Sequence, residues 1–242
     1  MALTHAYAAY KNAMMRRMKP ILVAGLCGAL VGLLATRIGL PRIANIPFFR
    51  KDYALLGHGV FYYACLACWV AFSVYWDIAA KNSAPAKSSE AKTSRGLHVF
   101  LANAAVIMIG APIQGLGRFL PLSSLLMAVG LGLEIAGLGL AIWARRHLGR
   151  NWSGEITIKD EHQLIKTGPY GYLRHPIYTG LLMMYAGLTV ATGEWLGIIG
   201  LVVAVVAYWR KTRLEEATLG RAFGAEYDTY RADTWAIVPG IF

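Results

Sequence analysis

The most informative stretch of this sequence is GPYGYLRHPIYTG, residues 168–180. It places Arg174 and His175 directly before Pro176, at the start of an apolar run of helical length. Proline suits the first turn of a helix, where its missing N–H group is no loss. Charged side chains are costly at a membrane boundary unless they have partners. The stretch therefore predicts a helix that begins at Pro176, with a site for an anionic group beside its first turn.

The composition is that of a membrane protein. Hydrophobic residues make up 57% of the 242 residues and charged residues only 15%, and the mean hydropathy is +0.46. An ordinary soluble domain is about a quarter charged, so we expect a polytopic membrane protein. Cys27, Cys65 and Cys68 all lie in apolar runs without other metal ligands, and we interpret them as packing residues.

Six apolar segments predict an all-α bundle of about six transmembrane helices. They are residues 21–40, 54–76, 97–113, 122–144, 177–190 and 195–209. Only Ala191 to Glu194 separates the last two segments, which predicts an antiparallel helical hairpin. At roughly 1.5 Å per residue, each leg falls short of a hydrocarbon core about 30 Å thick. The hairpin should therefore borrow flanking residues or be partly shielded by protein.

Basic residues are distributed unevenly between the two ends of these segments. With the amino terminus in the cytoplasm, 19 of the 24 Lys and Arg residues fall in residues 1–20, 81–96, 145–176 and 210–242. The positive-inside rule then predicts that both termini and the candidate site are cytoplasmic. In a bacterium, the inner membrane is the expected location. The net charge of +11 is accounted for by topology and membrane lipids, so no nucleic-acid partner is expected.

A polar segment rich in serine, alanine and lysine, residues 81–95, predicts a flexible division of the chain. We expect an N-terminal part, residues 1–96, with two helices and this loop. The remaining core, residues 97–242, would hold four helices and the candidate site. Within the core, four glycines repeat along one helix and predict close helix–helix contacts. They are Gly130, Gly132, Gly137 and Gly139.

The hairpin is expected to bring two distant polar stretches together. Its two legs leave and return on the same side, so His175 should lie near Glu215 and Glu216. The alternative is that both carboxylates belong to the solvated face of an amphipathic helix over residues 210–221.

Several motifs together resemble isoprenylcysteine carboxyl methyltransferases and their bacterial relatives, with phospholipid N-methyltransferases as a neighbouring branch. The motifs are GRNWS at 149–153, HQL at 162–164, the stretch at 168–180, Glu215-Glu216 and FGAEY at 223–227. The resemblance covers roughly residues 122–239, and the first two or three helices carry no assigned motif. It implies S-adenosyl-L-methionine as the cofactor and a lipophilic acceptor taken from the bilayer. A carboxylate is the favoured acceptor group.

The resemblance also implies roles for single residues. Arg174 and Glu216 are expected to be catalytic, Arg174 either as a brace for the glutamates or against an anionic substrate. The expected cofactor-binding residues are His162, Leu164, Gly168, Tyr170, Tyr172, His175, Pro176, Tyr178, Glu215 and Glu216. No metal is expected.

Among these residues, His175 and the helix start at Pro176 would hold the methionyl carboxylate of the cofactor. Glu215 and Glu216 would accept hydrogen bonds from the ribose or the amino group. The three tyrosines would wall the cofactor, and the loop at 162–168 would contact the adenosine through its backbone.

Glu134 lies in the middle of the segment at 122–144, where carboxylates are rare. We expect it either to line a tunnel for the lipophilic substrate or to pair with His98 or Asn103 inside the bundle.

Two other activities stay open at the level of the sequence. Methylation of a phospholipid amine would require a base, whereas a carboxylate acceptor is already ionised and requires mainly positioning. NADPH-dependent reduction is the other, because membrane proteins of the sterol-reductase type share an Arg-His-Pro segment. Those proteins tend to have Asn where this chain has Ile177.

Overall fold

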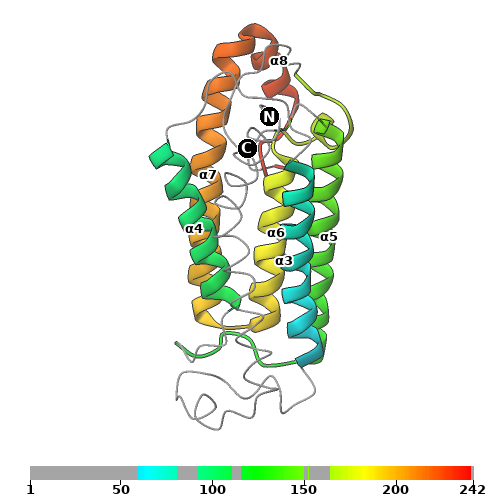
Figure 1. The fold of residues 1–242 in the computed structure, drawn as a ribbon, viewed down its shortest axis with the longest axis vertical. Coiled ribbons are helices and arrows are strands. Elements are labelled where there is room, and N and C mark those ends of the chain that lie inside the picture. The colour runs from blue at the N-terminus through cyan, green and yellow to red at the C-terminus, as the bar shows by residue number, and fades with distance from the viewer. Residues whose placement is uncertain (1–58, 81–91, 111–115, 150–151, 153–163, 241–242) are drawn as a thin grey trace, which may run out of the picture.

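The computed structural model describes residues 59–80, 92–110, 116–149, 152 and 164–240. Within these ranges the chain is helical, with two isolated β-bridges and no strand. The helices are α3 (Gly59–Ala80), α4 (Lys92–Gly110), α5 (Ser124–Leu148), α6 (Pro176–Thr192), α7 (Trp195–Phe223) and α8 (Ala225–Asp233), with a 3₁₀ turn, η2, at Gly168–Gly171. The long helices run side by side, and α8 lies at one end of them (Figure 1).

The expected all-α membrane fold is confirmed. The helices α3, α4, α5 and α7 are long and apolar enough to cross a membrane, and α6 is a shorter apolar helix. The segment predicted at residues 21–40 lies outside the described residues, as do most of the polar loop at 81–95 and the start of the segment at 54–76.

The helix α7 differs from its predicted extent. It does not end near Trp209 but continues to Phe223, so that Glu215 and Glu216 lie on the second leg of the hairpin itself. The added residues are mostly Lys, Arg, Leu, Glu and Ala, which are strong helix formers. Because one continuous helix carries both carboxylates, their position relative to the start of α6 is set by helix geometry.

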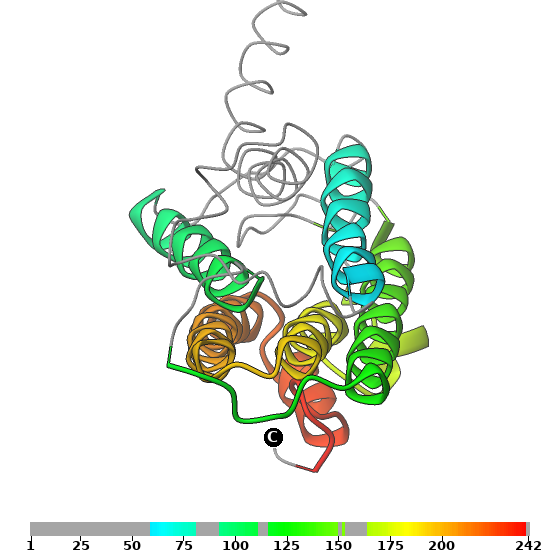
Figure 2. The same cartoon turned by 90° about the horizontal axis from the view of Figure 1, so that it is seen from below.

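Viewed along their axes, the described helices form an arc in the order α4, α7, α6, α5, α3 (Figure 2). The helix α6 lies in the middle of this arc and is the most buried of the five. Met184, Tyr185 and Leu188 on α6 are all fully buried. The arrangement confirms the hairpin, since α6 and α7 are neighbours in space as well as in sequence.

The helices α5 and α6 touch through their backbones. A Cβ atom on Gly137 would lie 2.4 Å from the carbonyl oxygen of Gly180, and one on Gly130 would lie 2.5 Å from that of Gly187. Backbone atoms cannot rotate away as a side chain can, so both helices need glycine at these crossings. The two α6 glycines are the partners that the α5 pattern did not identify.

The other two glycines of the α5 pattern, Gly132 and Gly139, do not pack in this way. Among the described residues, nothing lies within 4 Å of a Cβ atom built on either of them. Within the described residues, this pair therefore makes none of the helix contacts that the pattern predicted. The reason is rotational, because residues two positions apart on a helix face different directions.

The turn between α6 and α7 is shorter than predicted, because Thr192 still belongs to α6. Gly193 has a left-handed φ of +63°, and its N–H group donates to the carbonyl of Thr189 at 2.8 Å. Arg118, from the segment before α5, donates through Nη1 to the Thr192 carbonyl at 2.8 Å. Its Nη2 lies 3.8 Å from Glu194 Oε1. These contacts fasten the end of the hairpin opposite to His175.

We expect Gly137→Ala to lower the thermal unfolding temperature of the detergent-solubilised protein. The added methyl group would meet the Gly180 carbonyl, and relieving that contact costs about 1–3 kcal/mol. Gly139→Ala on the same helix is the matched control and should be neutral or slightly stabilising. Equal unfolding temperatures for the two variants would contradict the observed α5–α6 contact.

Candidate functional site

The start of α6 is paired with residues 231–236, which we call the C-terminal segment. Leu173 and Trp235 form a parallel β-bridge, and α6 begins at Pro176 as predicted. The N–H group of Arg174 donates to the carbonyl of Trp235 at 2.7 Å, and that of His175 donates to Ala236 at 2.9 Å. The two amides directly before Pro176 are therefore engaged within the protein. The binding of an anion by the first turn of α6 itself stays a prediction.

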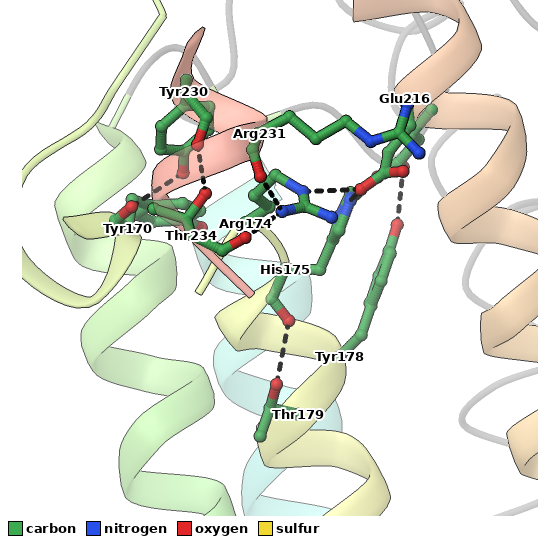
Figure 3. Close-up of polar contacts among 10 residues, drawn as sticks. Tyr170, Arg174, His175, Tyr178, Thr179, Glu216, Tyr230, Arg231 and Thr234 are labelled. Carbon is green, nitrogen blue, oxygen red and sulfur yellow. Dashed lines mark hydrogen bonds and ion pairs between the residues drawn. The ribbon is translucent and has the colours of Figure 1, made fainter. Parts of the chain in front are cut away.

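The side chain of His175 lies between two carboxylates of α7, as Figure 3 shows in part. Its Nδ1 is 3.4 Å from Glu215 Oε2, and its Nε2 is 3.5 Å from Glu216 Oε1. Arg174 Nε donates to Glu216 Oε1 at 2.7 Å, and the Tyr178 hydroxyl donates to Glu215 Oε1 at 2.6 Å. The structure thus brings together the residues that the hairpin argument expected to converge. We call these five residues the charge cluster.

The charge cluster is shielded from solvent. Arg174, His175 and Glu216 are 8%, 6% and 9% exposed. Burial disfavours a charge on His175, but the hydrogen bonds and charges of Glu215 and Glu216 outweigh burial and raise its pKa. The two carboxylates therefore favour the charged form of His175, in which both ring nitrogens carry a proton.

Because the imidazole touches both carboxylates, no ligand can lie between His175 and the glutamates in this arrangement. The alternative that Glu215 and Glu216 are simply a solvated helix face is wrong for Glu216, which is buried against Arg174.

Arg174 also ties the charge cluster to the C-terminal segment. Its Nη1 donates to the carbonyl of Arg231 at 3.0 Å and to the carbonyl of Thr234 (Figure 3). Together with the bond to Glu216, these contacts give Arg174 the geometry of a brace. A direct catalytic role for Arg174 stays a prediction.

The three tyrosines expected around the cofactor have different environments. The Tyr178 ring is stacked on His175, with centroids 5.5 Å apart and planes 2° apart. Tyr170 is buried against α5, and its carbonyl accepts a hydrogen bond from the Tyr230 hydroxyl at 2.7 Å. Tyr172 is 76% exposed. Of the three tyrosines, only Tyr178 therefore belongs to the charge cluster.

The turn η2 is held against the end of α5 by His147. A Cβ atom on Gly168 would lie 2.7 Å from the His147 ring, and Gly168 has a φ of +59°. The ring nitrogen Nε2 of His147 lies 2.8 Å from Thr167 Oγ1. Leu164 is half-buried, and His162 lies outside the described residues. His147 carried no motif by itself, so the sequence did not mark it.

A second contact that the sequence did not mark connects α3 to the motif-bearing part of the chain. Arg145 is buried, and it donates to the carbonyls of Gly149 at 2.8 Å and Ala79 at 2.5 Å. Its guanidinium lies 4.3 Å from the centroid of the Trp152 ring, which itself packs edge-on against Trp76. The expected division at residue 96 is therefore bridged by direct contacts.

Glu134 is fully buried in the middle of α5. Neither carboxylate oxygen has a hydrogen-bond partner among the described residues, although the Cys65 thiol of α3 lies beside it. Asn103 donates to a carbonyl of its own helix, and His98 lies against the Ala207 carbonyl. The expected pairing of Glu134 with His98 or Asn103 is therefore wrong. Its role beside a substrate stays a prediction.

A cavity of about 260 Å³ opens beside Glu216, between α7 and α8. We call it the α7–α8 cavity. Its lining residues are Arg213, Glu216, Ala217, Gly220, Tyr227, Asp228 and Arg231. Apart from Glu216, none of them was expected at the site.

Comparisons with known proteins connect this geometry to a class of enzymes. Residues 125–226, from α5 into α8, match the family model of phospholipid methyltransferases. These residues contain the whole charge cluster. The resemblance drawn from the sequence motifs is thereby confirmed at the level of the class.

Two individual relatives have the same name, protein-S-isoprenylcysteine O-methyltransferase. The protein-S-isoprenylcysteine O-methyltransferase of Dictyostelium discoideum is 32% identical over 84 residues, covering 34% of this chain and 35% of that protein. The enzyme of the same name from Saccharomyces cerevisiae is 30% identical over 125 residues, covering 49% of this chain and 51% of that protein. The chain thus spans about a third to a half of the length of these relatives. The resemblance to isoprenylcysteine carboxyl methyltransferases is confirmed.

One solved structure covers nearly the whole chain. It is a eukaryotic intramembrane Ras methyltransferase, isoprenylcysteine carboxyl methyltransferase, which aligns with a TM-score of 0.45 at 14% identity. The alignment covers 93% of this chain and 97% of that one.

We expect Arg174→Gln to destabilise the protein strongly, by about 3–5 kcal/mol, because the buried Glu216 carboxylate would lose its closest cation. Lys166→Gln is the matched control, since the Lys166–Glu226 pair at 2.8 Å is exposed and such pairs contribute about 0–1 kcal/mol. Thermal unfolding in detergent would measure both changes. A small effect of Arg174→Gln would contradict the role of brace.

The raised pKa of His175 predicts a pH-dependent stability. The stabilisation is fully present below the ordinary histidine pKa of about 6.5 and is lost as the pH rises through the folded-state value. Unfolding temperatures of the wild type should therefore fall more steeply above neutral pH than those of His175→Gln. Parallel curves for the two proteins would show that His175 does not carry the charge.

Proposed function

We propose that this integral membrane protein transfers the methyl group of S-adenosyl-L-methionine to the carboxylate of a lipophilic acceptor. The observation that carries the proposal is the buried charge cluster at the polar end of an apolar bundle. The cluster lies within the residues that match methyltransferases. The names of the relatives supply the acceptor class, because an isoprenylcysteine has an apolar chain next to a free carboxylate.

The residues beside the charge cluster suit this cofactor. When bound, S-adenosyl-L-methionine supplies a methyl group activated by a sulfonium, and it also carries an amino-acid end and ribose hydroxyls. The α7–α8 cavity presents carboxylate, guanidinium and phenol groups beside Glu216. The Tyr178 ring, stacked on His175, adds an aromatic face that would attract a sulfonium.

The contacts made by His175 and the two glutamates favour a carboxylate acceptor over an amine. An ammonium acceptor must first lose a proton, which requires a neutral base near the reacting atom. His175 lies between the two glutamates, which already accept hydrogen bonds from Arg174 and Tyr178. A carboxylate requires no base, so the protein has to supply only position and exclusion of water.

Methylation of a phospholipid amine is the second candidate. It is favoured by the description of the matching family, phospholipid methyltransferase. The sequence relatives named above are methyltransferases, which favours methyl transfer over nicotinamide-dependent reduction.

The surface of the described helices suits an acceptor that arrives through the bilayer. Large apolar side chains are exposed along the helices, among them Val60, Phe100, Leu125 and Val202. Such a surface is stable in lipid but not in water. By the positive-inside rule, we place the charge cluster and both termini on the cytoplasmic side, which is the inner membrane's cytoplasmic face if the host is bacterial.

The test is a labelling reaction with purified protein in lipid nanodiscs. The methyl donor is S-adenosyl-L-methionine labelled in its methyl group, and the acceptors are an S-prenylated cysteine derivative and phosphatidylethanolamine. We expect label on the prenylated cysteine that alkali releases as methanol, because esters hydrolyse and N-methyl groups do not. Alkali-stable label on the phospholipid would favour the amine alternative instead. No label on either acceptor would contradict the proposal.

We expect Glu216→Gln to lower the labelling rate at least about tenfold, because a hydrogen bond to a charged group is worth roughly 1.5–3 kcal/mol. Glu226→Gln is the control, since this glutamate is exposed on α8 and pairs with Lys166 at the surface. Thermal unfolding of both variants separates loss of activity from loss of fold. A Glu216→Gln protein that is folded and fully active would remove Glu216 from the proposed site.

A further inference from the structure

The α7–α8 cavity is lined by charges of both signs. Glu216 is buried and belongs to the charge cluster as well as to the cavity. Arg213, Asp228 and Arg231 are exposed residues of the same lining. The Arg231 side chain extends toward Glu216 (Figure 3). With two arginines and two acids, the lining is electrically balanced.

Tyr227 adds an observation that points to a ligand. Its side chain lines the cavity and is only 2% exposed. The hydroxyl oxygen is buried, and among the described residues it has no hydrogen-bond partner. A buried phenol without a partner costs free energy, so such a group usually has a ligand or water to bind. Burial raises the pKa of Tyr227 above its ordinary value, so the hydroxyl keeps its proton and can donate.

This mixture of groups selects among ligand chemistries. A simple anion would bind to the arginines but would be repelled by Glu216 and Asp228. A simple cation would bind to Glu216 and Asp228 but would be repelled by the two arginines. A ligand with a carboxylate and an ammonium on neighbouring atoms can satisfy both pairs at once. The lining therefore matches a zwitterionic α-amino-acid group.

The volume of the cavity is large enough for one part of a drug-sized ligand. Cavities that enclose a whole drug-sized molecule measure about 300–1,000 Å³, and this one measures about 260 Å³. The remainder of a larger molecule would have to lie outside it, beside the charge cluster that shares Glu216.

We propose that the α7–α8 cavity binds the amino-acid end of S-adenosyl-L-methionine, an inference that rests on the proposed function. Arg213, Arg231 and the Tyr227 hydroxyl bind the carboxylate, while Glu216 and Asp228 bind the ammonium. This assignment replaces the expected carboxylate site at His175 and Pro176. The amides there donate to Trp235 and Ala236, and the His175 ring contacts the glutamates.

The test compares two probes that differ only at the amino-acid end of the cofactor. S-adenosylhomocysteine keeps that end, and 5′-methylthioadenosine has the same nucleoside and a thioether without it. Their dissociation constants would be measured by calorimetry on the full chain in detergent. We expect Tyr227→Phe and Arg231→Gln each to weaken S-adenosylhomocysteine about tenfold, the loss of one hydrogen bond to a charged group. Affinity for 5′-methylthioadenosine should stay within about twofold of the wild type.

The variants are chosen to keep the fold. Tyr227→Phe removes a hydroxyl that has no protein partner among the described residues. Arg221→Gln is the control for the loss of one positive charge, because Arg221 lies on α7 outside the cavity and contacts Ala217 and Thr218 of its own helix. It should change neither affinity.

Three outcomes would overturn the inference in distinguishable ways. Unchanged binding of S-adenosylhomocysteine to both variants would remove the cavity from the cofactor site and leave the proposed function intact. Equal weakening of both probes would show that these residues act on the nucleoside or on the fold. A wild-type protein that binds neither probe would contradict the proposed function itself, and the inference with it.

Discussion

Glu216 lies buried on α7 next to the start of an apolar helix, where a carboxylate without a partner would cost several kcal/mol. Arg174 and His175 pair with Glu216, and His175 also pairs with Glu215. Both basic residues occupy the two positions directly before α6. Because α6 begins at Pro176, directly after these two residues, the backbone that carries both cations is held in place by the helix. Charge neutralisation therefore fixes how the polar half of α7 lies against the start of α6.

The C-terminal segment is part of this arrangement. The carbonyls of Arg231 and Thr234 accept from the Arg174 side chain, while Trp235 and Ala236 accept from the backbone before α6. Each of these carbonyls would otherwise require water at the membrane boundary. The same bonds hold α8 close to α7, where the two helices enclose the α7–α8 cavity. The charge cluster and the cavity thus share Glu216 and are held in place by the same hydrogen bonds.

This unit limits the chemistry that the protein can perform. Its imidazole lies between the two carboxylates, which accept hydrogen bonds from Arg174 and Tyr178, so the cluster has the properties of an electrostatic support and not of a general base. A support of this kind suits a reaction between a charged donor and an acceptor that is already nucleophilic. Glu134 stays outside the scheme, buried beside Cys65 at the α5–α6 contact.

The class of fold, the start of α6 and the convergence at the charge cluster could be predicted from the sequence. These features depend on local information, namely hydropathy, the fixed φ of Pro176, and a turn too short for any other return path. Once the hairpin is given, the proximity of His175 to the carboxylates of α7 follows from geometry.

Only the tertiary structure decided which groups pack and which remain exposed. It selected Gly137 over Gly139 for the contact with α6, left Tyr172 on the surface, and paired the C-terminal segment with Arg174. Composition cannot reveal these choices, because each depends on the rotation of a helix or on a contact between residues far apart in the chain. The α7–α8 cavity is of the same kind, since it exists only where α7 and α8 meet.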